Sequence, residues 1–180
     1  MAVGIVPTEG RGDLPYLLLG GIALKAWATT ALEQAGATPI ARDMPWSAVQ
    51  ELGVPVVLHD PLCPLTPATL LGEAIAASAS LDVVVGCRPV TDTIKTVTDG
   101  KVRGTVDRER LLAVASPIVF PPHVVAALTQ WPDAADFAEL VTALRERFPV
   151  RFVEVPPLGR RVDDRSALHV LAAAAEMHQD

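Results

Sequence analysis

The 180-residue chain contains only two cysteines, Cys63 and Cys87. Two cysteines are too few for a disulfide framework, so we expect both to be buried thiols in a reducing, cytoplasmic compartment. The chain also lacks a hydrophobic run of the roughly 18 residues that a membrane-spanning helix needs. Its first residues lack the basic segment of a signal peptide. These absences predict a cytoplasmic protein without a membrane partner.

Positive charge is also scarce. The sequence has 15 Lys and Arg against 21 Asp and Glu, which gives a net charge of -6 at pH 7. Because an acidic protein repels the phosphate backbone, we expect no nucleic-acid partner, although a local basic pocket for a small anion remains possible. Hydrophobic residues make up 50% of the chain and charged residues 20%, which excludes disorder and a coiled coil. The length suits one domain over residues 1–180.

Strands and helices alternate along most of the sequence. Short apolar runs predict strands over residues 2–6, 54–58, 81–86 and 151–155, and a further strand that ends at residues 119–120. Between them we predict helices over residues 22–35, over 68–79 with Thr66 as N-cap, one that Asp133 caps, and a final one that starts at Asp163 or Asp164. This alternation predicts an α/β fold with a mostly parallel twisted sheet and helices on both faces. In such folds ligands bind beyond the carboxyl ends of the strands.

One segment does not follow the alternation. Residues 89–106 are rich in Thr and Val and contain Asp99-Gly100, a strong signal for a two-residue hairpin turn. Because its flanks carry little apolar surface and an isolated two-stranded ribbon is marginal in water, another molecule should cover it. We therefore predict a projecting β-arm over residues 89–108 that joins two copies of the chain. The alternative is a mobile surface hairpin on a monomer.

The first predicted strand leads directly into a glycine-containing loop. The loop consists of Pro7, Thr8, Glu9, Gly10, Arg11 and Gly12. Glycines in such a loop allow backbone amides to face a phosphate group. The loop is therefore a candidate phosphate site, although an ordinary connection between a strand and a helix would have the same composition.

The second predicted strand ends in His59-Asp60. A carboxylate at the carboxyl end of a central strand is suitably placed to hold Mg²⁺ against nucleotide phosphates. Because Pro61 follows at once, a turn or helix-capping aspartate is the alternative.

Two further clusters of charged residues lie near the arm and the last helix. The first comprises residues 92–95, Asp-Thr-Ile-Lys, together with Asp107-Arg108 after the hairpin. The second comprises residues 159–161, Gly-Arg-Arg. Guanidinium groups at these positions are suited to phosphate, and the alternative for both clusters is a solvated basic edge.

The order of these clusters resembles the 2-C-methyl-D-erythritol 4-phosphate cytidylyltransferase family. That family has a strand ending in His-Asp-Ala-Ala-Arg-Pro, where this chain has His-Asp-Pro-Leu-Cys-Pro at residues 59–64. The family's arm begins with Asp-Thr-Ile-Lys and ends with Val-Asp-Arg, which match residues 92–95 and 106–108. Its Lys-Val-Thr before the last helix is similar to Arg-Val-Asp at residues 161–163.

The resemblance implies a Rossmann-like nucleotidyltransferase domain that dimerises through its arm. It also implies transfer of CMP from CTP to 2-C-methyl-D-erythritol 4-phosphate with release of pyrophosphate, a step of the non-mevalonate route to isoprenoids. Asp60 would hold Mg²⁺ when nucleotide is bound. The other implied roles are nucleotide binding by Pro7, Thr8, Glu9, Gly10 and Gly12, substrate binding by Asp92, Thr93 and Arg108, and catalysis by Arg11 and Arg161.

Several positions depart from the family pattern. Tyr16 stands where the family has a loop lysine, Cys63 where it has an arginine, and Ala167 where it has a carboxylate. The segment between Ile40 and Val54 is also shorter than in the family. Loss of cations that stabilise the transition state lowers rates by orders of magnitude. Two hypotheses follow: a cytidylyltransferase with a reduced nucleotide loop, or a catalytically silent homologue that binds a phosphate ligand or a protein.

Overall fold

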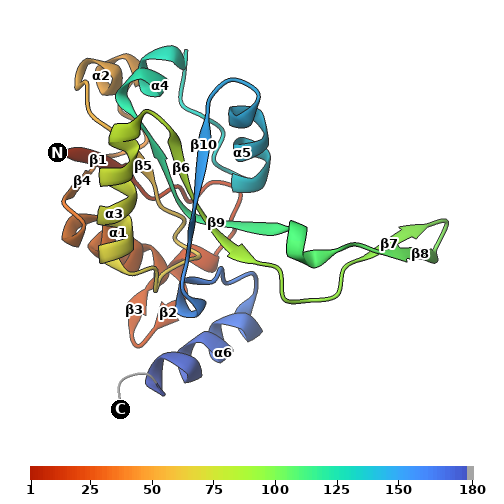
Figure 1. Ribbon diagram of the computed structural model, residues 1–180. Coiled ribbons are helices and arrows are strands. Elements are labelled where there is room, and N and C mark those ends of the chain that lie inside the picture. Colours follow the sequence, from red (N-terminus) through yellow and green to blue (C-terminus); the bar gives the residue numbers. More distant parts are fainter. Residues whose placement is uncertain (178–180) are drawn as a thin grey trace.

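A computed structural model describes residues 1–177, apart from the side chain of residue 110, and contains a central six-stranded sheet (Figure 1). The strand order is β10-β6-β9-β5-β1-β4. These strands are β1 (Ala2–Ile5), β4 (Ala37–Pro39), β5 (Val56–Leu58), β6 (Val83–Pro89), β9 (Leu112–Phe120) and β10 (Val150–Glu154). All neighbouring pairs are parallel except those of β9, which runs antiparallel to both β5 and β6. The predicted mostly parallel α/β fold is confirmed.

Residues 1–177 also form six α-helices. They are α1 (Leu24–Gln34), α2 (Trp46–Glu51), α3 (Ala68–Ala77), α4 (Pro122–Ala127), α5 (Phe137–Arg145) and α6 (Arg165–Glu176). Short 3₁₀ turns are η1 (Leu14–Tyr16), η2 (Ser78–Ser80), η3 (Arg108–Arg110) and η4 (Pro157–Gly159), and a small hairpin joins β2 (Leu18–Leu19) to β3 (Ile22–Ala23). Within residues 1–177 no helix has the length and hydropathy needed to cross a membrane.

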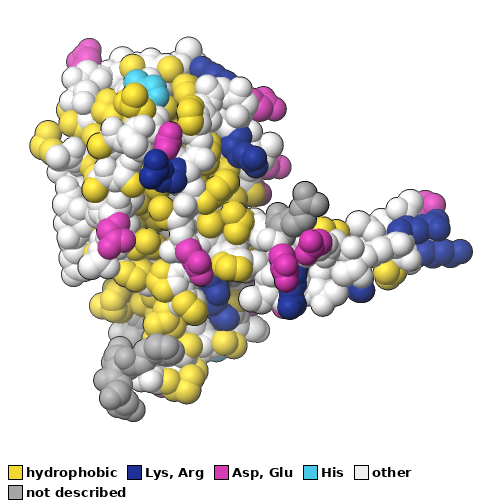
Figure 2. Space-filling view, in the orientation of Figure 1, with side chains coloured by type: hydrophobic (Ala, Val, Ile, Leu, Met, Phe, Trp, Pro, Cys, Tyr) yellow, Lys and Arg dark blue, Asp and Glu magenta, His cyan; other side chains and the backbone are white. Residues whose placement is uncertain are grey.

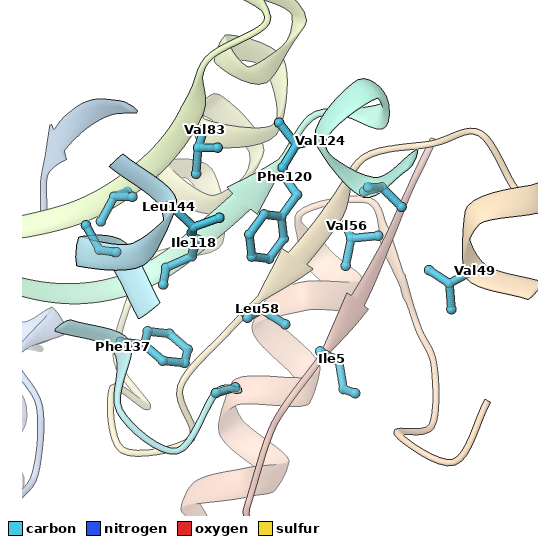
Figure 3. Packing of buried hydrophobic residues seen from close by; sticks show 14 of the residues in the cluster. Ile5, Val49, Val56, Leu58, Val83, Ile118, Phe120, Val124, Phe137 and Leu144 are labelled. Atoms are coloured by element: carbon cyan, nitrogen blue, oxygen red, sulfur yellow. The ribbon is translucent and has the colours of Figure 1, made fainter. Parts of the chain in front are cut away.

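Alternation along the strands divides the core between the two faces of the sheet. On one face, residues such as Ile118 and Phe120 of β9 pack with α2, α4 and α5 (Figure 3). On the other face, Val119 packs with Leu32 of α1 and Ala74 of α3. Successive side chains of a strand point to opposite faces, so strands with continuous apolar sequence are buried on both sides. This arrangement fixes the sheet whose strand ends carry the candidate site.

Two predicted helix caps are wrong. The N-cap of α3 is Pro67, whereas the Thr66 hydroxyl donates a hydrogen bond to the Cys63 carbonyl at 3.0 Å. The N-cap of α5 is Asp136, which accepts hydrogen bonds from two backbone amides of the first turn. Asp133 instead accepts a hydrogen bond from the backbone amide two residues later. In both cases a turn satisfies the side chain locally before the helix begins.

Two other helix starts can be compared with the structure. Asp164 is the N-cap of α6, as one of the two predicted alternatives, and its carboxylate accepts a hydrogen bond from the Ala167 amide. The predicted helix at residue 22 begins later, at Leu24, because Ile22 and Ala23 form β3 and pair with β2.

The predicted hairpin is confirmed and projects away from the sheet (Figure 1). It consists of β7 (Lys95–Thr98) and β8 (Lys101–Thr105), and every residue of these two strands is exposed. Asp99 and Gly100 both have positive φ, 51° and 71°, as a tight primed hairpin turn requires. Basic side chains gather towards its tip (Figure 2). Dimerisation through this arm stays a prediction.

Candidate functional site

Three predicted site residues from distant parts of the sequence meet at one point. Asp60 follows β5 at its carboxyl end and lies between two guanidinium groups. Its Oδ1 is 2.8 Å from Nε of Arg11, and its Oδ2 is 3.2 Å from Nε of Arg161. The loop after β1 supplies Arg11, the end of β5 supplies Asp60, and the segment before α6 supplies Arg161, so the carboxyl end of the sheet assembles the group.

The Arg11 guanidinium is enclosed by the protein. Beyond the contact with Asp60, its Nη1 donates to the Glu9 carbonyl and its Nη2 to the Ala134 carbonyl, each at 2.8 Å. The group also lies 5.4 Å from the ring centre of Phe137. Only 1% of the side chain is exposed. Arg11 therefore fixes the loop after β1 to Asp60 and to the segment before α5.

The Asp60 carboxylate is fully engaged in this arrangement. Its Oδ1 also accepts a hydrogen bond from the Leu62 amide at 3.0 Å, and its side chain is 4% exposed. Within residues 1–177, moreover, no three His, Cys, Asp or Glu residues are grouped to hold a metal ion. Mg²⁺ prefers oxygen ligands and octahedral geometry, whereas here guanidinium groups occupy both carboxylate oxygens. This donor set does not fit a resident Mg²⁺ ion.

His59 and Ser116 support Asp60 from the sheet side. The Ser116 hydroxyl accepts a hydrogen bond from the Asp60 amide at 2.9 Å, which leaves its own proton for His59 Nδ1 at 2.5 Å. Burial, partly opposed by the negative charge of Asp60, lowers the pKa of His59 to about 4. The imidazole is therefore neutral at pH 7. Ser116 can come this close only because residue 86 is glycine: a Cβ there would lie 2.6 Å from the Ser116 backbone.

A cleft opens beside Asp60, at the base of the arm. It has a volume of about 470 Å³ and extends from the end of β6 and the start of the arm to the segment before α6. Its charged lining residues are Arg88, Asp92, Arg160, Arg161 and Asp163. A smaller cavity of about 220 Å³, lined by Asp60 and the start of α5, shares Arg161 with it. We call the larger one the arginine cleft, because three of its five charged side chains are guanidinium groups.

Arg161 is the accessible member of the group around Asp60. Its side chain is 41% exposed, and its Nη1 forms an ion pair with Asp163. Burial disfavours the charge, but the attraction of Asp60 outweighs this effect and raises the pKa of Arg161 above its ordinary value. Arg161 thus stays charged while facing the cleft, where an anion can reach it.

The predicted substrate residues lie near the cleft but do not all line it. Asp92 is part of the lining. Thr93 is exposed at the start of the arm. Arg108 is exposed at the end of the arm, where its Nη1 donates a hydrogen bond to the Thr91 carbonyl at 2.5 Å. Neither Thr93 nor Arg108 lines the arginine cleft of this single chain.

The residues of the predicted nucleotide loop differ in exposure. Pro7 is buried and Thr8 half-buried, while Glu9, Gly10 and Gly12 are exposed. The Thr8 amide donates to the Glu9 carboxylate at 3.1 Å, so the loop pairs one of its donors internally. Tyr16, at the position of the family's lysine, is 58% exposed.

Arg88 was not predicted from the sequence. It lies near the carboxyl end of β6 and lines the arginine cleft. The rule that directs attention to the carboxyl ends of strands would have found it, since the predicted strand over residues 81–86 ends just before it. Cys63 and Cys87 are buried and free, as expected. Burial raises the pKa of the Cys63 thiol.

Comparison with known sequences gives one consistent result. A sequence model of the 2-C-methyl-D-erythritol 4-phosphate cytidylyltransferase family matches residues 45–154, more than half of the chain. The cytidylyltransferase of Syntrophotalea carbinolica is 34% identical over 97 residues, 51% of this chain and 42% of that protein. That of Parasynechococcus marenigrum is 29% identical over 140 residues, 74% of this chain and 61% of that protein. The matches thus span less than two thirds of these relatives.

Solved structures match over almost the full chain. The cytidylyltransferase from Thermus thermophilus superposes with a TM-score of 0.69 at 22% identity, covering 98% of each chain. The 4-diphosphocytidyl-2C-methyl-D-erythritol synthase from Anaerococcus prevotii gives a TM-score of 0.68 at 13% identity, also covering 98% of each chain. At these identities the likeness establishes the fold.

Proposed function

Because the chain belongs to the 2-C-methyl-D-erythritol 4-phosphate cytidylyltransferase family, we propose that it binds a phosphorylated polyol of the methylerythritol phosphate type. The observation that carries the proposal is the arginine cleft, where Arg88, Arg160 and Arg161 converge on one cavity. Guanidinium groups are well matched to phosphate because they offer paired donors and a permanent charge. Asp92 adds an acceptor for a hydroxyl group of the polyol.

The residues on the nucleotide side of the site argue against efficient transfer. Arg11, the nearest candidate for the family's loop cation, is enclosed by protein atoms. Tyr16 has no charge to offer a triphosphate, and the exposed Glu9 would repel one. Since transfer depends on cations around the reacting phosphates, we propose a phosphate-ligand-binding homologue with little or no cytidylyltransferase activity.

The second candidate is transfer of CMP from CTP, and the retained arm motifs favour it. In this reaction a phosphate oxygen of methylerythritol phosphate attacks the α-phosphorus of CTP, and the bond to the β-phosphate oxygen breaks to release pyrophosphate. Arg161 would then stabilise phosphate charge. Mg²⁺ is expected only with bound nucleotide, and it would have to take an arginine's place at Asp60.

Both candidates include a homodimer joined by the arm in the cytoplasm. The strands β7 and β8 are exposed along their whole length, and Val97 and Val102 are 60% and 64% exposed. A two-stranded ribbon with exposed valines gains stability when a second copy covers it. In that arrangement Thr93 and Arg108 would be free to reach the partner's cleft.

Two measurements separate these candidates. Calorimetric titration with methylerythritol phosphate tests the binding function, and we expect saturable binding that Arg161→Gln weakens. A pyrophosphate-release assay with CTP, Mg²⁺ and methylerythritol phosphate tests the transfer, and we expect a rate near the background. Absence of binding would refute the binding function, whereas steady turnover that Arg161→Gln abolishes would establish the enzyme in its place.

A further inference from the structure

Asp60 has two cationic partners, and they differ in access. Arg11 is 1% exposed and Arg161 is 41% exposed. We propose that phosphate binds in the arginine cleft without a divalent cation, and that Asp60 limits the affinity by competing with the ligand for Arg161. This inference rests on the proposed binding function and concerns how the same site is charged.

Arginine side chains lie at Asp60 where a metal ion would otherwise bind. A Mg²⁺ ion bound to Asp60 would lie about 2.1 Å from a carboxylate oxygen. Nε of Arg11 already lies 2.8 Å from Oδ1, and Nε of Arg161 lies 3.2 Å from Oδ2. A dication at either oxygen would thus be pressed against a like charge. The two guanidinium groups already neutralise the Asp60 carboxylate, so it needs no metal as a counter-charge.

Arg161 is shared between carboxylates. Its Nε contacts Asp60 and its Nη1 contacts Asp163, which is 69% exposed. A phosphate that enters the cleft must draw these donors away from the carboxylates or share them. Asp60 and Asp163 therefore act as internal anions that the ligand has to displace, and removing either negative charge should tighten phosphate binding.

The two possible roles of Asp60 predict opposite changes in phosphate affinity when its charge is removed. If Asp60 holds a metal that binds phosphate, then Asp60→Asn weakens binding and chelation of the metal does the same. If Asp60 competes for Arg161, then Asp60→Asn strengthens binding and chelation has no effect. The sign of the change is therefore more informative than its size.

The experiment is a calorimetric titration of the full chain with inorganic phosphate and with methylerythritol phosphate, in Mg²⁺ and in EDTA. We expect the wild-type affinity to agree within about twofold between the two buffers. Asp60→Asn should tighten binding by about 3- to 10-fold, and Asp163→Asn by about 2- to 3-fold, as the release of a partly exposed ion pair allows. Asp82→Asn, which makes the same charge change at the opposite end of β6, should leave the affinity unchanged.

Folding limits one variant but not the other. Asp60→Asn leaves the buried Arg11 without its counter-charge, which can prevent folding. Asp163 is exposed and pairs only at the surface, so Asp163→Asn decides the question alone if Asp60→Asn does not fold. Weaker or unchanged binding in Asp163→Asn, or a loss of wild-type affinity in EDTA, overturns the inference while leaving the binding function intact. If no variant and no buffer gives binding of either ligand, the proposed function itself fails.

Discussion

The loop after β1 and the cleft below the arm both place arginine near Asp60, but only the cleft leaves arginine accessible. In the loop, Arg11 donates hydrogen bonds to Asp60 and to two backbone carbonyls. In the cleft, Arg161 keeps 41% of its side chain exposed. The same residue type therefore serves the fold on one side of a carboxylate and is available for a ligand on the other. Burial distinguishes these roles, whereas residue identity does not.

The largest effect should come from removing Arg11. Arg11→Met would leave Asp60 buried with the more exposed of its two cations, and we expect the free energy of unfolding to fall by about 3–5 kcal/mol. Chemical denaturation measures this change. Arg151→Met is the matched control, because Arg151 pairs with Asp82 at the surface, where such pairs contribute about 0–1 kcal/mol. Equal effects of the two variants would mean that the enclosed Arg11–Asp60 pair contributes no more to stability than a surface ion pair.

The stability of the fold should also depend on pH, through His59 on the buried side of Asp60. Its pKa is lowered to about 4 in the folded protein, by burial, from 6.5 in the unfolded chain. As the pH falls from 6.5 towards 4, the unfolded chain takes up a proton that the folded protein does not, so stability is lost in this window. The loss should reach about 3 kcal/mol and then contribute nothing further below pH 4.

His59→Gln tests the origin of that pH dependence. Gln does not titrate, so denaturation curves of the variant between pH 6.5 and pH 4 should show a shallower loss than those of the wild type. Carboxylates titrate in both proteins, and the difference between them therefore isolates the imidazole. Parallel curves would mean that His59 does not contribute to the loss of stability at low pH.

A change of Arg161, on the accessible side of Asp60, should affect ligand binding more than stability. Arg161→Gln removes a charged donor from the cleft, and we expect methylerythritol phosphate to bind about 10- to 30-fold more weakly, as loss of a charged hydrogen bond implies. The unfolding free energy should change by less than about 1 kcal/mol. Arg165→Gln is the nearby control, because Arg165 pairs with the exposed Asp13. A stability loss as large as that of Arg11→Met would contradict the assignment of Arg161 to the cleft.

The smallest effect on the fold should come from the arm. Replacing residues 93–104 with a short Gly/Ser link removes β7 and most of β8, none of which is buried. We expect a dimer to become a monomer in light scattering, with little change in the denaturation midpoint. If the intact chain is already monomeric at high micromolar concentration, the arm does not join two copies.

Much of the fold follows from local sequence. Buried β-branched runs and a positive-φ turn at Asp99-Gly100 are decided by residues within a few positions of one another. The antiparallel direction of β9 and the true cap at Asp136 depend on tertiary packing and on competing turns, so local patterns missed them. The sequence also indicated that Arg11, Asp60 and Arg161 belong to the site. It could not show that Arg11 is enclosed, because Ala134 and Phe137 approach from a distant segment.

We propose that this site retains the side that binds the phosphorylated polyol, the arginine cleft, and has lost the nucleotide side, the loop after β1. Calorimetric titration of one protein sample with methylerythritol phosphate and, separately, with CTP in Mg²⁺ tests it most directly. We expect saturable binding of methylerythritol phosphate and no heat of CTP binding up to millimolar concentration, because Arg11 is enclosed and Tyr16 carries no charge. Micromolar binding of CTP would show that the nucleotide side is retained.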